Sequence, residues 1–214
     1  SNLPYTSSLT GYDMRNRVGN SSVFAEAKYL ISDKWASQTA YAYSVQNMDE
    51  YNMVFTSFEN DSLLSRSVYA LRGGKYTGMD IQQNFIGSLY TGTVKHRILL
   101  GLDYYNSNIL SASNFVPYDA DLNFTQPGTA NMTIERLSDS IALYGLSNNN
   151  YNQNVYAAYA SDVINFTDKL IGMASLRVDH FVSTGDGGYK QTALSHKFGL
   201  IYQIVKDQVS LFAN

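Results

Sequence analysis

The chain has 214 residues, a formal net charge of −3 at pH 7 and no cysteine. The small negative charge, without a basic stripe, argues against a nucleic-acid partner. The lack of cysteine excludes disulfide frameworks and thiolate metal sites. Only 15% of the residues are charged, whereas 18 are Tyr and 10 are Phe, and the apolar residues are scattered singly. This texture favours half-buried β-strands over helices.

No apolar run approaches the roughly 18 residues that a membrane helix requires. The longest apolar patches resemble the one from Ile98 to Leu102. A helical membrane protein is therefore excluded. A transmembrane β-barrel remains open, because its strands alternate between polar and apolar residues and each crosses the membrane with about 10 of them.

Alternation between turn signals predicts about eight strands, joined by connections of two kinds. Three connections are long, at about 47–76, 106–153 and 183–189. The short ones are polar reversals at Ser32-Asp33-Lys34, Thr91-Gly92-Thr93, Thr167-Asp168-Lys169 and Lys206-Asp207. Because neighbouring strands alternate in direction, all short turns fall at one rim and all long connections at the other. This asymmetry is typical of bacterial outer-membrane barrels.

Each predicted strand carries an apolar face and a polar face. The apolar faces contain, in chain order, Val23, Ala25, Ala27, Tyr29, Ile31, Ile98, Leu100, Leu102, Tyr104, Leu170, Gly172, Ala174, Leu176, Val178, Phe198, Leu200, Tyr202 and Ile204. The polar faces contain Glu26, Lys28, Arg97, Gly101, Asp103, Lys169, Ser175, Arg177, Asp179, Lys197, Gly199 and Gln203. In a membrane barrel the apolar face meets lipid and the polar face lines the lumen. A soluble β-sandwich gives the same alternation by turning its apolar face into a core, so the pattern leaves both open.

Four segments resemble, in the same order, the barrel of TonB-dependent ferric-siderophore receptors. They are 18–46 with its S-D-K-W turn, TGTVKHRILLGLDYY at 91–105, 156–180 ending in TDKLIGMASLRVDH, and KQTALSHKFGLIYQIVKDQVSLFAN at 190–214. The last resembles the family signature F-G-L-x-Y-x-P-x-x-x-x-S-L-F-A. It departs from that signature at Ile204, where the family usually has proline.

The resemblance implies an all-β fold, an antiparallel transmembrane β-barrel with short periplasmic turns and long external loops. Residues 1–214 are then expected to supply about eight strands of a barrel of roughly 22 strands. The plug domain and the TonB-engaging segment of such receptors are absent from these residues. The chain is expected to be a central section of the barrel that begins in an external loop and stops inside a strand. A closed eight-stranded barrel is the competing architecture.

The resemblance also implies a function, namely TonB-energised uptake of a ferric siderophore, of the ferrichrome type, across the bacterial outer membrane. The implied partners are the ferric chelate, outer-membrane lipid and the TonB complex, the last through regions outside this chain. No cofactor and no enzymatic activity are expected. A passive porin or small structural outer-membrane barrel is one alternative. A soluble β-sandwich binding module is the other.

The predicted ligand contacts are aromatic residues of the first two long connections, Tyr51, Phe55, Phe115 and Tyr118. Phe115 stands in a place similar to that of an aromatic residue in ferrichrome-type receptors, soon after the G-x-D-Y strand. Rigid rings suit a ferric chelate, because they cover its apolar or planar faces at low entropic cost. The other interpretation is that these rings pack the loops together.

No catalytic or metal site is predicted from the sequence. The three histidines, His96, His180 and His196, lack the spacing of a metal motif, and the carboxylates are dispersed. Arg177 and Asp179 lie on one predicted strand face, which is typical of a structural charge network in a barrel lumen.

Overall fold

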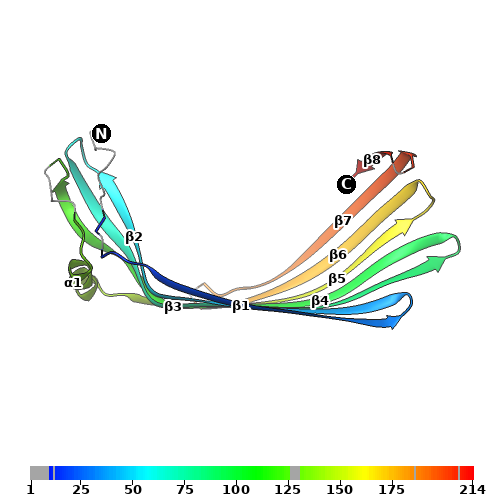
Figure 1. The fold of residues 1–214 in the computed structure, drawn as a ribbon, viewed down its shortest axis with the longest axis horizontal. Coiled ribbons are helices and arrows are strands. Elements are labelled where there is room, and N and C mark those ends of the chain that lie inside the picture. The colour runs from blue at the N-terminus through cyan, green and yellow to red at the C-terminus, as the bar shows by residue number, and fades with distance from the viewer. Residues whose placement is uncertain (1–9, 12, 126–130, 186, 207) are drawn as a thin grey trace. The chain divides into compact units, whose positions relative to one another are not determined.

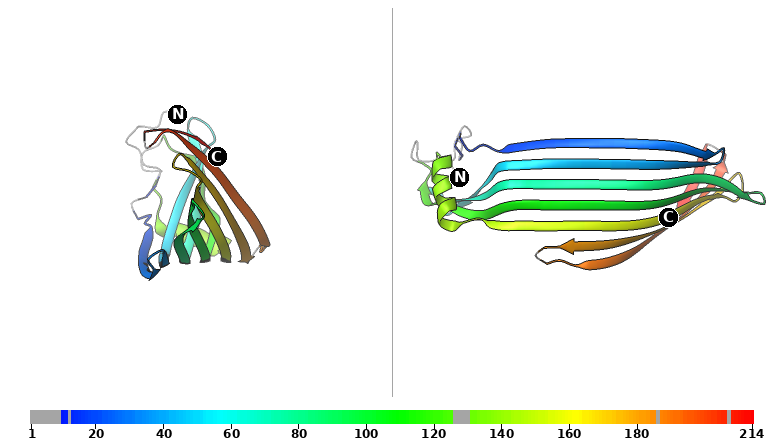
Figure 2. Two further views of the ribbon diagram at one scale, coloured as in Figure 1. Left: turned by 90° about the vertical axis from the view of Figure 1, so that its right-hand side faces the viewer. Right: turned by 90° about the horizontal axis from the view of Figure 1, so that it is seen from below.

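The computed structural model describes residues 10–11, 13–125, 131–185, 187–206 and 208–214, which form eight strands and one helix. The strands make a single sheet in which each strand pairs with its neighbours in chain order (Figure 1, Figure 2). In chain order they are β1 (Arg17–Ser32), β2 (Trp35–Phe58), β3 (Leu63–Thr91), β4 (Val94–Asn123), β5 (Ser147–Asn165), β6 (Leu170–Thr184), β7 (Lys190–Val205) and β8 (Val209–Ala213). The helix is α1 (Ile134–Tyr144). It is not of a length and hydropathy that would span a membrane, and no other helix occurs in these ranges.

The short turns lie where the sequence predicts them. β1 ends at Ser32 and β2 begins at Trp35, and β3 and β4 are separated only by Gly92 and Thr93. The turn between β5 and β6 and the connection between β6 and β7 also agree with the prediction. Asp207 of the last predicted turn lies outside the described residues.

Two predicted long connections are wrong. β2 extends to Phe58 and β3 begins at Leu63, so the connection expected at 47–76 is four residues long. β4 extends to Asn123, and α1 occupies part of what remains of the connection expected at 106–153. The physical reason is that the many Asn, Ser and Asp residues of 47–58 and 106–123 are typical of loops, whereas pairing in the sheet and burial of Val116 in the core of unit 1 keep these segments extended. A structureless connection of that length is itself evidence against the assignment.

The chain forms two compact units, and β1 to β5 contribute to both. Unit 1 comprises 1–21, 45–76 and 108–151. Its core lies between α1 and one face of the sheet, and consists of Val68, Ala70, Val116, Tyr118, Met132 and Leu137. Since side chains alternate along a strand, the neighbouring positions Tyr69 and Phe115 lie on the opposite face.

Unit 2 comprises 22–44, 77–107 and 152–214 and has the two-faced strands that the sequence predicts. Arg177 of β6 stands opposite Tyr159 of β5 and Ser195 of β7, so these three residues share one face. Leu176 stands opposite Ala160 and His196 on the other face. The predicted alternation along 169–182 is therefore confirmed.

The apolar face of unit 2 is exposed. Phe198 is 66% exposed, and Leu176 and Leu200 are about half exposed. A β-sandwich would bury these side chains against a second sheet, and the described residues form only one sheet. β1 and β8 lie at the ends of the strand order, so the described residues show no ladder that would close an eight-stranded barrel.

The helix α1 was not predicted, although its sequence carries signals for it. Thr133 is its N-cap and Gly145, with φ of 72°, ends it. Ile134, Leu137 and Ile141 recur at helical spacing, and Leu137 is fully buried in the core of unit 1.

Candidate functional site

Three aromatic rings from three adjacent strands meet on the face of unit 1 opposite α1. The ring centroids of Phe55 on β2 and Phe115 on β4 are 5.1 Å apart. Tyr69 on β3 lies 5.1 Å from the same Phe115 ring. Phe115 is 57% exposed and Phe55 is 44% exposed, so a ligand can reach both rings. We call Phe55, Tyr69 and Phe115 the aromatic triad.

The structure brings together two of the four predicted contact residues and separates the other two from them. Phe55 and Phe115 belong to the aromatic triad, whereas Tyr51 lies half-buried four residues earlier on β2. Tyr118 is only 4% exposed and belongs to the core beneath α1. Tyr118 therefore has a supporting position in this conformation. Tyr69 was missed, because no local pattern shows that β3 brings this ring beside Phe115.

The Tyr118 side chain connects the sheet to the start of α1. Its hydroxyl oxygen accepts a hydrogen bond from the backbone N–H of Thr133 at 2.7 Å. Its ring centroid lies 4.8 Å from the guanidinium carbon of Arg136 and 5.4 Å from that of Arg66. Such cation–π contacts are stronger when they are shielded from water. Tyr118 thus holds the helix against the strand that carries Phe115.

A buried ion pair lies beside Tyr118. Arg66 on β3 donates through Nε to Asp119 Oδ1 at 3.1 Å and through Nη2 to Asp119 Oδ2 at 2.5 Å. The Arg66 side chain is 0% exposed and that of Asp119 is 6% exposed. The fork geometry satisfies both carboxylate oxygens and offsets part of the cost of burying the charges. This pair links the start of β3 to the end of β4, close to the positions of Tyr69 and Phe115.

The first turn of α1 is capped by side chains. Thr133 Oγ1 accepts a hydrogen bond from the backbone N–H of Arg136 at 3.3 Å, and Asp13 Oδ2 accepts one from the N–H of Ile134 at 2.9 Å. These bonds satisfy donors that have no partner inside the helix.

Replacing Thr133 by Ala is expected to destabilise α1 by about 1 kcal/mol, because the cap hydrogen bond to Arg136 is lost. The measurement is amide hydrogen exchange in α1, which should become faster in Thr133→Ala. Thr133→Ser keeps the cap oxygen and should exchange like the parent. Equal exchange in all three proteins would show that the cap does not hold the helix.

The polar face of unit 2 carries a charge network across β4 and β6. Arg177 Nη2 lies 2.8 Å from Asp103 Oδ2, and Arg177 Nε lies 2.9 Å from Asp179 Oδ1. The network contains more carboxylates than cations, which suits contact with water or with polar groups. The predicted position of Arg177 and Asp179 on one face is confirmed, and the two side chains form an ion pair there.

An aromatic residue extends this network towards β3. The Tyr159 ring lies 5.2 Å from the Arg177 guanidinium carbon, and its hydroxyl donates to Asn84 Oδ1 at 2.5 Å. Gly101 makes this arrangement possible, since a Cβ at that position would overlap the Tyr159 ring. The side chains therefore cross β4 over a glycine to join β3, β5 and β6.

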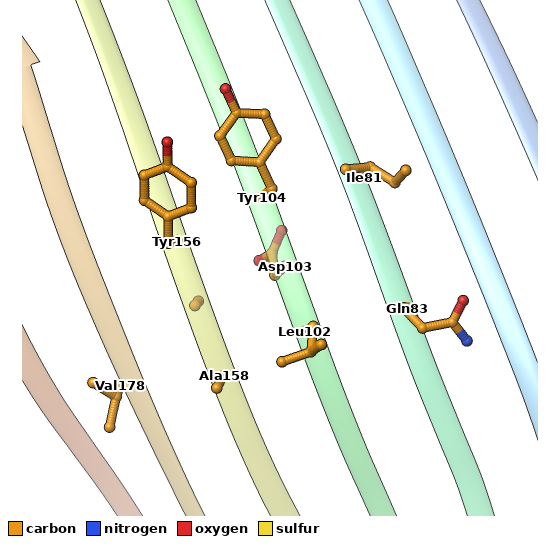
Figure 3. A pocket seen from close by; sticks show the side chains of 9 residues that line it. Ile81, Gln83, Leu102, Asp103, Tyr104, Tyr156, Ala158 and Val178 are labelled. Carbon is orange, nitrogen blue, oxygen red and sulfur yellow. The ribbon is translucent and has the colours of Figure 1, made fainter.

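The apolar face of unit 2 contains an open groove of about 560 Å³, shown with its lining side chains in Figure 3. The Tyr104 and Tyr156 rings pack at 5.0 Å at one end of it, and both hydroxyls point the same way (Figure 3). Tyr104 donates a hydrogen bond to Asn154 at 2.8 Å. Leu102, Ala158 and Val178 continue the apolar lining. Tyrosines with an apolar body and a polar tip are typical of the boundary between lipid and water.

Histidine chemistry is limited in this structure. Within 10–11, 13–125, 131–185, 187–206 and 208–214, no three His, Cys, Asp or Glu side chains are arranged to hold a metal ion. His96 Nδ1 lies 2.7 Å from Asp162 Oδ2, and His180 Nδ1 lies 2.9 Å from Thr192 Oγ1. Neither of these two contacts has the geometry of a metal centre.

The fold and its two faces define a class of protein. One antiparallel sheet with short turns, an exposed apolar face and a polar face with a charge network is the wall of a β-barrel of the outer-membrane type. Residues 1–214 match the family described as "TonB dependent receptor-like, beta-barrel", and the chain belongs to this family. Its members are transport receptors known as outer-membrane proteins. The predicted fold class, all-β and part of such a barrel, is confirmed.

Among curated proteins, the chain is similar to the metal-pseudopaline receptor CntO of Pseudomonas aeruginosa strain UCBPP-PA14. The two are 23% identical over 217 residues, which cover 91% of this chain and 29% of the relative. The same identity and coverage are found with CntO of strain PAO1. The chain thus spans less than a third of the length of these relatives.

Solved structures show the same fold. The ferric preacinetobactin receptor BauA from Acinetobacter baumannii superimposes with a TM-score of 0.76 at 18% identity, covering 92% of this chain and 30% of that one. The siderophore receptor PiuA from the same species gives a TM-score of 0.57 at 13% identity, covering 89% of this chain and 31% of the other.

Proposed function

We propose that this chain is part of an outer-membrane receptor that takes up a ferric siderophore with energy from TonB. The observation that carries the proposal is the aromatic triad, an exposed and uncharged contact surface in a chain of the TonB-dependent receptor family. Relatives named as receptors for metal-pseudopaline and ferric preacinetobactin support a metal chelate as the ligand.

The aromatic triad suits a chelate for a physical reason. A ferric siderophore surrounds the metal with an organic shell whose faces are planar or uncharged. Three rings fixed on neighbouring strands can cover such a face with little loss of side-chain entropy. Phe55 and Phe115 present the largest exposed areas, and Tyr69 holds the Phe115 ring from β3.

Each part of the chain has a place in this proposal. The apolar face of unit 2, with Leu176 and Phe198, meets outer-membrane lipid, and the polar face with Arg177 lines the lumen. The 214 residues are a section of a larger barrel of roughly 22 strands, and the plug and the TonB-engaging segment belong to regions outside them. The protein is a transporter and not an enzyme. The ferrichrome-type subclass and the central position in the barrel belong to the same proposal.

The test is binding of ferric chelates to the full-length protein. Purified protein is titrated with hydroxamate, catecholate and carboxylate chelates, with heme and with cobalamin, and uptake is measured with and without TonB. Saturable binding of one ferric chelate and TonB-dependent uptake are expected. Chelate-independent, passive permeability would instead support a porin.

Replacing Phe115 by Ala is expected to weaken chelate binding by about 1 to 2 kcal/mol, because the apolar contact of a partly buried ring is lost. The measurement is a chelate titration on the parent and the variant. Phe58→Ala is the matched control, since Phe58 is 49% exposed on the same strand as Phe55 but pairs with Phe124 instead. Equal affinities in all three proteins would show that Phe115 packs against its neighbours and does not bind the chelate.

A further inference from the structure

A histidine and an aspartate form a pair on the apolar face of unit 2. His96 lies on β4 and Asp162 on β5, and their side chains are 18% and 28% exposed. Asp162 stands opposite Ala174 of β6, two positions from Leu176, so it shares the face of Leu176 and not that of Arg177. The distance between His96 Nδ1 and Asp162 Oδ2 is 2.7 Å.

An ionisable pair on the apolar face of unit 2 is expected to have a polar binding partner. Ionisable side chains within a membrane are costly and are usually paired and functional. Asp162 Oδ2 contacts His96, whereas Oδ1 is shielded and has no hydrogen-bond partner among the described residues. With Oδ1 enclosed, a ligand approaches the carboxylate from the Oδ2 side, next to the imidazole. There it also meets Nε2 of His96, the ring nitrogen that does not contact Asp162.

An apolar groove begins at this pair. It has a volume of about 400 Å³, and its lining consists of Asp162, Ile98, Ala160, Ala174, Leu176 and Phe198 together with Ser161 and Ser175. The small side chains of the two alanines leave space in the groove, and the larger side chains form its walls. The groove therefore has one ionisable lining residue, Asp162, with the His96 ring beside it, and two serines in an otherwise apolar lining.

The groove runs along the strands, from the end near the short turns towards the middle of the sheet. His96 lies two residues after the start of β4, and Asp162 lies three residues before the end of β5, so both are near the short turns. Ile98, Ala160 and Leu176 lie further from those turns on β4, β5 and β6. An amphiphile with its polar head near the short turns and its tail along the wall fits this arrangement.

We propose that the His96–Asp162 pair and this groove bind a phospholipid whose headgroup carries a primary ammonium and a phosphate. The ammonium donates to the Asp162 carboxylate, which the His96 ring holds in place from 2.7 Å. The carboxylate thus opposes the positive charge of the headgroup, and an acyl chain lies between Ile98, Leu176 and Phe198. The proposal rests on the proposed function, which turns the apolar face of unit 2 to lipid.

The test is native mass spectrometry of the full-length protein in detergent. The protein is incubated with phosphatidylethanolamine, phosphatidylcholine and phosphatidylglycerol of identical acyl chains. The parent is expected to retain phosphatidylethanolamine about 10-fold more than phosphatidylcholine, whose methylated ammonium has no N–H to donate to a carboxylate. Phosphatidylglycerol has no ammonium and should also be retained less.

Three variants separate the headgroup from the groove. Asp162→Asn is expected to lower the retention of phosphatidylethanolamine about 10-fold, to the level of phosphatidylcholine. Ala174→Phe fills the groove and should lower the retention of all three lipids. Asp168→Asn removes an exposed carboxylate in the turn between β5 and β6 and should behave like the parent.

Folding is checked by heat-modifiable migration in gels, and Asp162→Ser and Ala174→Leu replace any variant that does not fold. Equal retention of the three lipids by the parent, or undiminished phosphatidylethanolamine in the folded Asp162 variant, overturns the lipid site. If such a protein still binds its chelate, the proposed function stands. A protein that is folded and monomeric in buffer without detergent overturns the lipid-facing assignment itself.

Discussion

Replacing Asp119 by Ala is expected to destabilise unit 1 by about 3 to 5 kcal/mol, because the Arg66 guanidinium would remain buried without its carboxylate partner. The Arg66 side chain is fully buried, and both of its bonds to Asp119 would be lost. Water cannot easily replace the carboxylate at this place, since Tyr118 and the core of unit 1 lie beside the pair. This loss is a large fraction of the stability of a typical domain.

The measurement is urea unfolding of the full-length protein, together with amide hydrogen exchange in β3 and β4. Exchange at Leu64 to Val68 should become faster in Asp119→Ala. The control is the double variant Arg66→Met with Asp119→Leu, which removes both charges and should lie much closer to the parent. If the double variant is as unstable as Asp119→Ala, packing and not the loss of the carboxylate beside Arg66 explains the lower stability.

The second large effect is expected on the apolar face of unit 2. Leu176→Arg should destabilise the protein by about 2 to 4 kcal/mol if Leu176 lies near the membrane midplane, because a guanidinium would then face lipid. Ser175→Arg places the same side chain one residue away on the face that carries Arg177, where it should cost much less. Both variants introduce an arginine on β6, and they differ in the face of the sheet that carries the new side chain.

Folding of the two variants is compared in lipid vesicles by urea titration and by heat-modifiable migration. A clear difference in the free energy of unfolding supports the assignment of the two faces. Equal losses would show that either the register of β6 or the lipid environment of Leu176 is wrong. The loss in Leu176→Arg should also shrink in a detergent that lets water reach this face.

The aromatic triad and the two faces connect stability to function. Tyr118 is buried in the core beneath α1, and the buried Arg66–Asp119 pair lies beside it, while Phe115 on the same strand as Tyr118 remains exposed. Substitutions in the buried set should therefore disturb the triad indirectly, through the position of β4. Phe115→Ala should change chelate affinity without changing thermal resistance, because it removes an exposed ring.

The sequence by itself determined the fold class, the short turns and the two faces of the strands of unit 2. These features depend on the period of two along a strand and on polar turn residues, both of which are local. The opposite faces of Leu176 and Arg177, for example, follow from alternation alone. The four segments that resemble siderophore receptors indicated the family, because their strand motifs are also visible in the sequence itself.

The lengths of β2, β3 and β4 and the helix α1 were not predicted, although local signals were present. Thr133, Gly145 and the apolar spacing from Ile134 to Ile141 indicate a helix. These signals lie in a polar stretch between long strands. In this stretch the aromatic and polar residues are compatible with either a loop or a strand, so packing determines the secondary structure. Here the burial of Leu137 against the sheet stabilises the helix.

Only the tertiary structure decided which distant residues meet. Phe55 and Phe115 were expected in separate connections, and their contact across Tyr69 depends on the order and register of β2, β3 and β4. The same order separates Tyr118 from them by burying it. His96 and Asp162 are 66 residues apart and meet because β4 pairs with β5. Pairing between strands brings together residues that are remote in the chain, and no local pattern records the partner.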